Sequence, residues 1–173
     1  MTVRRAAPAD AAAIGAVHVA AWRSAYPGIL PPDYLAQLSA FREARHYELA
    51  IRMGAIVHVA LAGERVVGFA TAGAARGTRL ADGEVETLYV LDDWRDRGFG
   101  RALMAASGAA LAAAGCRDAF LWVLRDNPSR WFYAHLGGRQ AAAGVVRVAG
   151  VEVAQTAFVW SPISLLVAPA AGA

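Results

Sequence analysis

Apolar and polar positions in the first third of the chain follow an extended period and then a helical one. Residues 3–5 form a short strand candidate, and Pro8 and Asp10 begin a helix, with Asp10 favouring its first turn through the helix dipole. One face of this helix collects Ile14, Val17, His18, Ala21 and Trp22. A connector rich in Pro and Gly at 26–33 then separates it from a second predicted helix at 34–50.

Two β-rich runs follow. Residues 55–61 and 66–71 flank Ala-Gly-Glu-Arg at 62–65, which predicts a hairpin. A polar loop that contains glycine occupies 73–83.

The middle of the chain carries the one clear strand–helix–strand unit. Strand 84–91 leads into a strong helix at 98–114, which Gly115 closes in the position of a left-handed C-terminal residue. The next apolar strand, within 118–124, should therefore run parallel to the first through a right-handed crossover.

Turn chemistry dominates the remaining segment. Asp-Asn-Pro-Ser at 126–129 begins a short helix at 130–136, which ends at two glycines. Residues 145–148 and 151–160 predict a closing hairpin, and little orders the chain after Ser161.

The element order predicts an α/β single domain. It matches neither strict strand–helix alternation nor a run of strands followed by helices. We expect a mixed, mostly antiparallel central sheet with the one parallel unit and helices on both faces. A chain of 173 residues fits one such domain.

Composition raises the question of membrane insertion, because 57% of the residues are hydrophobic and the mean hydropathy is +0.36. Much of this is alanine, and the longest uncharged stretches, 102–116 and 157–173, are short or broken by proline. We therefore expect no membrane contact. No apolar secretory segment follows Met1, so we expect a cytoplasmic protein. The single Cys116 excludes an internal disulfide and is expected to be a buried, inert thiol.

All 17 basic residues are arginine, and the net charge is +3. They are spread along the chain apart from Arg95, Arg97 and Arg101, whereas a nucleic-acid binder usually shows a clustered basic face. We therefore expect no nucleic-acid partner. The four histidines lack ligand spacing, so no metal site is expected.

Candidate chemistry concentrates where strand 84–91 passes through a basic loop into the next helix. The loop points backbone N–H groups and the positive end of a helix at one spot, which favours an anion. Gly98 and Gly100 would let a ligand approach the backbone, and Arg95 and Arg97 would add charge for a diphosphate. The alternative is an ordinary helix start with solvated arginines.

Two motifs make the pattern specific. Arg95-x-x-Gly98-x-Gly100 after Leu88-Tyr89-Val90 resembles the acyl-CoA-binding motif of the GCN5-related N-acetyltransferase (GNAT) superfamily. The segment 127–138, with Asn127 and Phe132-Tyr133, is similar to a second family motif, and 22–28 is similar to the first helix and loop of many bacterial members. The resemblance covers residues 2–161 and leaves 162–173 as a C-terminal tail.

The resemblance implies transfer of an acetyl group from acetyl-CoA to an amine by direct attack in a ternary complex. The residues it assigns to acyl-CoA are Leu88, Tyr89, Val90, Arg95, Asp96, Arg97, Gly98, Phe99, Gly100, Arg101, Asn127 and Tyr133. Asp92-Asp93 replaces the usual Pro-Glu, and Asp96 is an anion in a phosphate site that should point away, cap the helix or pair with an arginine.

The implied catalytic groups are few. A backbone N–H of Tyr89 or Val90 would polarise the thioester carbonyl, and Tyr133 would protonate the leaving thiolate. Glu84 is the first choice of base, directly or through water, and Glu86 the second.

Each assignment has a plain structural alternative. Tyr133 could be a core aromatic, Glu84 and Glu86 solvent-facing strand residues, and Asn127 a turn residue. Trp22 and Tyr26 are candidates for an acceptor pocket, although Trp22 could instead fill the core; loops 24–34 and 72–83 and the final hairpin would form the rest of that pocket.

Two other functions compete with catalysis. A GNAT-fold module could bind acyl-CoA without turnover, and a basic domain could bind nucleic acid. The acceptor amine is not encoded in any motif, and both a monomer and a homodimer are compatible with the resemblance.

Overall fold

The computed structural model describes residues 1–77 and 79–167. Its centre is a seven-stranded sheet in the order β1-β2-β3-β4-β5-β7-β6. The strands are β1 (Thr2–Arg5), β2 (Ile56–Ala62), β3 (Arg65–Ala74), β4 (Gly83–Val90), β5 (Ala119–Leu124), β6 (Arg139–Val148) and β7 (Val151–Trp160). Only β4 and β5 run parallel, and every other neighbouring pair is antiparallel. The predicted mixed sheet is confirmed.

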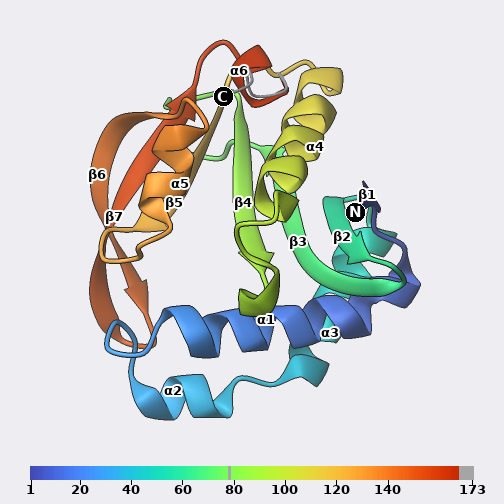
Figure 1. Ribbon diagram of the computed structural model, residues 1–173. Helices are drawn as coiled ribbons and strands as arrows, with labels where there is room; N and C mark the ends of the chain where they lie inside the picture. The colour runs from blue at the N-terminus through green and yellow to red at the C-terminus, as the bar shows by residue number, and fades with distance from the viewer. Residues whose placement is uncertain (78, 168–173) are drawn as a thin grey trace.

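Helices cover both faces of this sheet, as predicted. They are α1 (Ala11–Ala25), α2 (Pro32–Gln37), α3 (Ala40–Arg52), α4 (Phe99–Ala113), α5 (Arg130–His135) and α6 (Ser164–Val167). Helices α1 and α3 bury Ile14, Val17 and Tyr47 against β2 and β3. Helix α4 packs Leu103 on the opposite face. In Figure 1, α4 and α5 flank β4, and α1 runs across the end at which β4 finishes.

The predicted helix 34–50 is two helices. Leu38 has extended backbone angles, with φ −58° and ψ 133°, and ends α2. Ser39 then begins α3 as its N-cap, accepting a hydrogen bond from the Arg42 N–H over 3.4 Å. The break follows from the preference of serine for a cap over a helix interior.

The segment after Ser161 is better ordered than its composition predicts. Ile163 and Leu166 are buried against α4, and the lack of a side chain at Gly108 makes room for them. A Cβ at Gly108 would lie 2.8 Å from Cβ of Leu166. The packed domain therefore extends past the predicted boundary at 161, while residues 168–173 of the expected tail lie outside the described residues.

The feature that positions the site is the divergence of β4 from β5. The two strands pair only at Gly83 with Ala119 and at Glu84 with Phe120. Strand β4 also carries a β-bulge against β3, because Val85 pairs with Ala72 while Thr87 pairs with the adjacent Thr71. The extra residue, Glu86, shifts the alternation of side chains for the rest of the strand.

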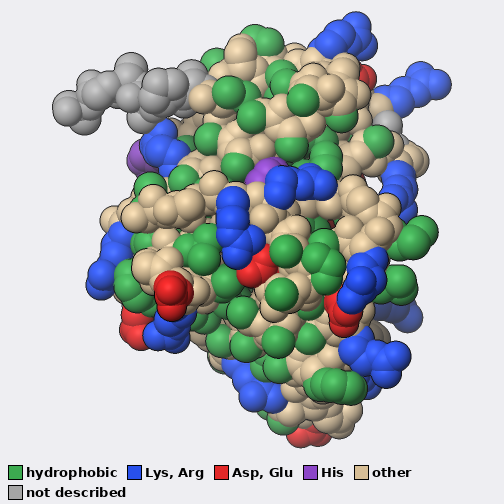
Figure 2. Space-filling view, turned by 90° about the vertical axis from the view of Figure 1, so that its right-hand side faces the viewer, with side chains coloured by type: hydrophobic (Ala, Val, Ile, Leu, Met, Phe, Trp, Pro, Cys, Tyr) green, Lys and Arg blue, Asp and Glu red, His purple; other side chains and the backbone are tan. Residues whose placement is uncertain are grey.

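Two surface features bear on the other expectations. No helix within the described residues is long and apolar enough to cross a membrane. On the face seen in Figure 2, the arginine side chains (blue) are scattered among apolar and neutral side chains and do not form one continuous patch.

Candidate active site

A cleft of about 900 Å³ opens where β4 and β5 diverge. It is lined by α1, β4, the loop before α4, β5, α5 and the β6–β7 hairpin. The predicted site residues that line it are Trp22, Tyr26, Glu86, Leu88, Tyr89, Val90, Arg95, Asp96, Gly98, Gly100, Arg101, Asn127 and Tyr133. The fold therefore brings most of the assigned residues to one cleft.

Three assigned residues lie outside the lining. Phe99 is buried beside Leu103 under α4, because the helix turns this position towards the core. The guanidinium of Arg97 lies over the Trp94 ring, 5.1 Å from its centroid, rather than in the cleft. Glu84 lies at the closed end, where β4 and β5 are still paired.

The start of α4 forms an anion cradle. Gly98 is its N-cap with φ 84°, a left-handed conformation that favours glycine. The first N–H groups of a helix have no partner within it, so those of α4 are available to a ligand beside Gly98 and Gly100. A Cβ at Gly100 would lie 3.1 Å from Cζ of Phe132, so this glycine keeps α4 close to α5. Arg95 and Arg101 add positive charge to the lining.

Asp92 holds this loop to α1. Its carboxylate accepts a hydrogen bond from the Ser24 hydroxyl and forms a 2.9 Å ion pair with Arg95. The residue that departs from the usual family pattern thus orients an arginine of the cradle. Asp96 is exposed and has φ 58°. Among the described residues it neither caps α4 nor pairs with an arginine, so two of the three expectations for its side chain are not met.

Strand β4 presents unpaired backbone groups to the cleft. The Leu91 N–H donates to the Val67 carbonyl over 2.9 Å, so position 91 faces β3. In an antiparallel pair the direction of N–H groups alternates, which points the Tyr89 N–H at β3 and the N–H groups of Leu88 and Val90 towards the open side. Of the two predicted donors to the thioester carbonyl, the geometry favours Val90.

Hydroxyl groups gather in the middle of the cleft. Tyr133 is 7% exposed, and burial, with a smaller effect from Tyr26, raises the pKa of its hydroxyl well above the ordinary value. Burial also raises the pKa of Tyr26, while hydrogen bonding with Tyr89 and Asn127 opposes the rise. These phenols are therefore protonated at neutral pH.

Asn127 forms the predicted turn and also lines the cleft. Its Oδ1 accepts a hydrogen bond from the Ser129 N–H over 2.9 Å, which forms the turn that begins α5. The side chain is nevertheless buried in the cleft lining next to Tyr26.

Glu86 is the only glutamate among the described residues that line the cleft. Its carboxylate lies on the α1 side of the sheet, where Oε2 accepts a hydrogen bond from the Thr71 hydroxyl over 3.3 Å. Thr71 also lies 2.9 Å from the Thr87 hydroxyl. Burial, and then the negative charge of Glu86, raise the pKa of Glu84.

For the side of the cleft formed by β5 and the hairpin, sequence reasoning expected the hairpin but missed β5 and the individual residues. Trp122, Val146, Val148 and Gln155 line it. Alternation along each strand could have placed these residues on a common face. The strand order, in which β7 rather than β6 pairs with β5, was not available from the pattern.

Comparison with known proteins identifies the fold and the family. Residues 53–137 match the family model described as an acetyltransferase (GNAT) domain. The uncharacterized N-acetyltransferase YuaI of Bacillus subtilis (strain 168) is 33% identical over 167 residues, which are 96% of each chain. The chain belongs to the GNAT acetyltransferase family.

Further relatives agree with this membership. An aminoglycoside N(6')-acetyltransferase type 1 of Stenotrophomonas maltophilia is 34% identical over 122 residues, covering 68% of this chain and 71% of the relative. A GCN5-related N-acetyltransferase structure from Rhodopseudomonas palustris superposes with a TM-score of 0.73 at 22% identity, covering 92% and 94% of the two chains. An acetyltransferase from Salmonella typhimurium, solved with acetyl-CoA, gives 0.70 at 21% identity, covering 100% and 97%.

This GNAT protein is an acetyl-CoA-dependent N-acetyltransferase. Its own residues fit that co-substrate. The glycines, N–H groups and arginines at the start of α4 suit the diphosphate of CoA, and the open edge of β4 suits the extended arm of CoA that carries the thioester. Among residues 1–77 and 79–167, no three His, Cys, Asp or Glu side chains converge to hold a metal ion.

Proposed function

We propose that the enzyme transfers the acetyl group directly to a primary amine while both substrates are bound. The observation that carries this proposal is the continuity of the cleft, which runs from the cradle at α4 past Val90 and Tyr133 to Glu86, Trp22 and Tyr26. One cavity thus joins the expected place of the thioester to a carboxylate.

The chemical step uses three groups of the enzyme. The amine nitrogen attacks the thioester carbonyl carbon, a C–N bond forms and the C–S bond breaks. The Val90 N–H stabilises the negative charge that develops on the carbonyl oxygen. The ammonium proton passes to Glu86, directly or through water, and the Tyr133 hydroxyl protonates the departing thiolate.

The placement of the two glutamates favours Glu86 over Glu84 as the base. Both belong to β4 and follow the same loop, but only Glu86 lines the cleft. We expect Glu86→Gln to lower kcat by about 10²–10⁴. The matched Glu84→Gln variant should keep kcat within a few-fold of wild type. Equal losses in both variants would contradict the assignment.

Kinetics separate direct transfer from its alternatives. Initial rates with varied acetyl-CoA and amine should give intersecting reciprocal plots, and mass spectrometry should show no acetylated enzyme without acceptor. Parallel plots with an acetylated chain would indicate a covalent intermediate. Binding of acetyl-CoA without CoA release on any amine would support the non-catalytic acyl-CoA-binding module instead.

Cytoplasmic location, a monomeric or homodimeric state and the lack of a nucleic-acid partner stay predictions. Binding of duplex DNA that weakens steeply with salt would contradict the last of them.

A further inference from the structure

The side of the cleft beyond Glu86 has an apolar and aromatic lining. We call this part the acceptor end. It comprises the C-terminal half of α1, the turn after it, and the facing side chains of β5 and the β6–β7 hairpin, represented by Trp22, Tyr26, Leu30, Trp122, Val146 and Val148. The rings of Trp22 and Tyr26 meet edge to face with centroids 5.0 Å apart, which gives this wall a fixed shape.

Charge divides the cleft into two unlike halves. Arg95 and Arg101 line it around the start of α4, and His135 lines it at the end of α5, all on the acyl-CoA side; Asp96, in the loop of Arg95, lies there too. Among the described residues that line the acceptor end, Glu86 alone carries a charge. An ammonium buried without a partner is costly, so this end can neutralise one positive charge and not several.

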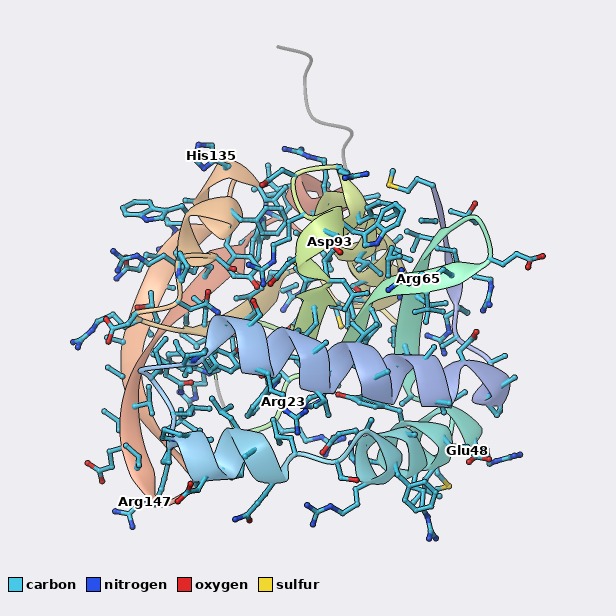
Figure 3. All side chains as sticks on the ribbon, turned by 60° about the horizontal axis from the view of Figure 1, so that its bottom comes forward. Arg23, Glu48, Arg65, Asp93, His135 and Arg147 are labelled. Carbon is cyan, nitrogen blue, oxygen red and sulfur yellow. The ribbon has the colours of Figure 1, made fainter. Side chains whose placement is uncertain are left out.

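The hairpin also forms one wall of the acceptor end. Val146, Val148 and Val153 belong to the same apolar cluster as Tyr26 and Leu30, so the hairpin packs directly onto the segment that follows α1. In Figure 3, Arg147 lies at the outer end of the β6–β7 hairpin, far from Asp93 and His135. The whole cleft of about 900 Å³ lies near the upper limit for small-molecule sites, roughly 300–1,000 Å³, and it must hold the acyl-CoA arm as well.

Resting on the proposed function of this site, we infer that the acceptor is a small primary amine with a single positive charge and an apolar or aromatic body. Glu86 takes the ammonium, and the rings of Trp22, Tyr26 and Trp122 take the apolar body. A polycationic amine would leave charges unpaired. The cleft of about 900 Å³ must also hold the acyl-CoA arm, and this limited volume favours a small acceptor over the terminus of a folded protein.

The first test measures binding and turnover separately. 2-Phenylethylamine, tobramycin and a Gly-Gly-Gly tripeptide amide, which has one charge but no apolar body, are titrated calorimetrically into the enzyme saturated with CoA. Each is then incubated with acetyl-CoA for product detection by mass spectrometry. We expect 2-phenylethylamine to bind at least 10-fold more tightly than tobramycin and more tightly than the peptide. Tighter binding of either competitor, or no binding of 2-phenylethylamine, overturns the inference. Binding without an acetylated product supports the acceptor class and counts against the proposed catalysis.

The second test adds a second charge to the acceptor end. Gln155 lines the cleft on β7, and Gln155→Glu has nearly the same shape with one more carboxylate. We expect affinity for 1,5-diaminopentane relative to 2-phenylethylamine to rise at least 10-fold. The same change at the exposed Gln140 on β6, outside the lining, should leave this ratio unchanged. An unchanged ratio in Gln155→Glu, or an equal rise in both variants, overturns the placement of the acceptor.

Discussion

Replacing Tyr133 by phenylalanine tests the assigned general acid most directly. The ring is buried among Phe132, Phe158 and Trp160, with centroids 5.3, 6.0 and 6.4 Å away. The hydroxyl donates no hydrogen bond to any described residue, so its removal leaves no protein partner unsatisfied. We therefore expect the free energy of unfolding to change by less than about 1 kcal/mol.

The catalytic loss should be much larger than the structural one. A positioned proton donor contributes about 10²–10⁴ in rate. At about 1.4 kcal/mol per factor of ten, this corresponds to roughly 3–5.5 kcal/mol of transition-state stabilisation. Because the hydroxyl acts on the leaving thiolate, the loss should appear in kcat, with little change in the Kd for acetyl-CoA.

The assay combines steady-state release of free CoA, calorimetric titration of acetyl-CoA and thermal unfolding. Tyr34→Phe is the matched control, since Tyr34 is a half-buried tyrosine near Trp22 that does not line the cleft. Near wild-type kcat for Tyr133→Phe on a confirmed acceptor would show that Tyr133 is a packing residue. Thiolate departure would then be assisted by water.

Three further changes test the cradle, the helix packing and the N-terminal segment. Gly100→Val drives a side chain into Phe132, because even its Cβ would lie 3.1 Å from the ring. This variant should weaken CoA binding more than 10-fold in calorimetric titration, and Arg101→Ala should weaken it less. Equal CoA affinities in both variants and the wild type would show that the cradle is not part of the site. Gly15→Ala places a Cβ 2.4 Å from the Ala40 carbonyl oxygen of α3, so the overpacking cost of about 1–3 kcal/mol should exceed the gain of about 1 kcal/mol in helix propensity. The Tm should fall, and a raised Tm would contradict the close helix crossing. Asp10 accepts hydrogen bonds from Arg4 over 2.7 and 2.9 Å, and this contact lowers the pKa of its carboxyl. The resulting stability, about 1 kcal/mol for a half-exposed pair, is present above the unfolded pKa of about 4 and is lost as the pH falls through the lower folded pKa. In urea unfolding, Asp10→Asn should therefore be less stable than wild type at pH 7, and the difference should shrink steadily as the pH falls below the unfolded pKa of about 4. A difference that does not shrink there would refute the assignment.

Short stretches of the chain determine most of the elements and the cradle. The turn at 62–65, the helix at 98–114 and the parallel unit around it follow from periodicity and turn residues a few positions apart. Gly98 has its left-handed conformation because the loop must reverse into a helix within two residues. Such features depend on neighbours in sequence, and for this reason the sequence alone predicts them.

The accepting side of the site depends on contacts between distant segments. A regular strand would place Glu84 and Glu86 on one face and Tyr89 on the other, whereas the bulge moves Tyr89 to the face of Glu84 and α1. Whether β4 bulges depends on which residues of β3 and of the two helix layers must be buried. The sequence of β4 alone does not contain that information.

The order of the last strands is decided in the same way. Pairing of β7 with β5 leaves β6 at the sheet edge and brings Gln155 and Val146 to the cleft. The alternation along each strand fixed which side chains share a face. Which face of the hairpin meets Trp22 and Tyr26 is determined only by the packing of the hairpin against the segment after α1. Burial of apolar surface is a property of the whole assembly of elements and not of any one of them.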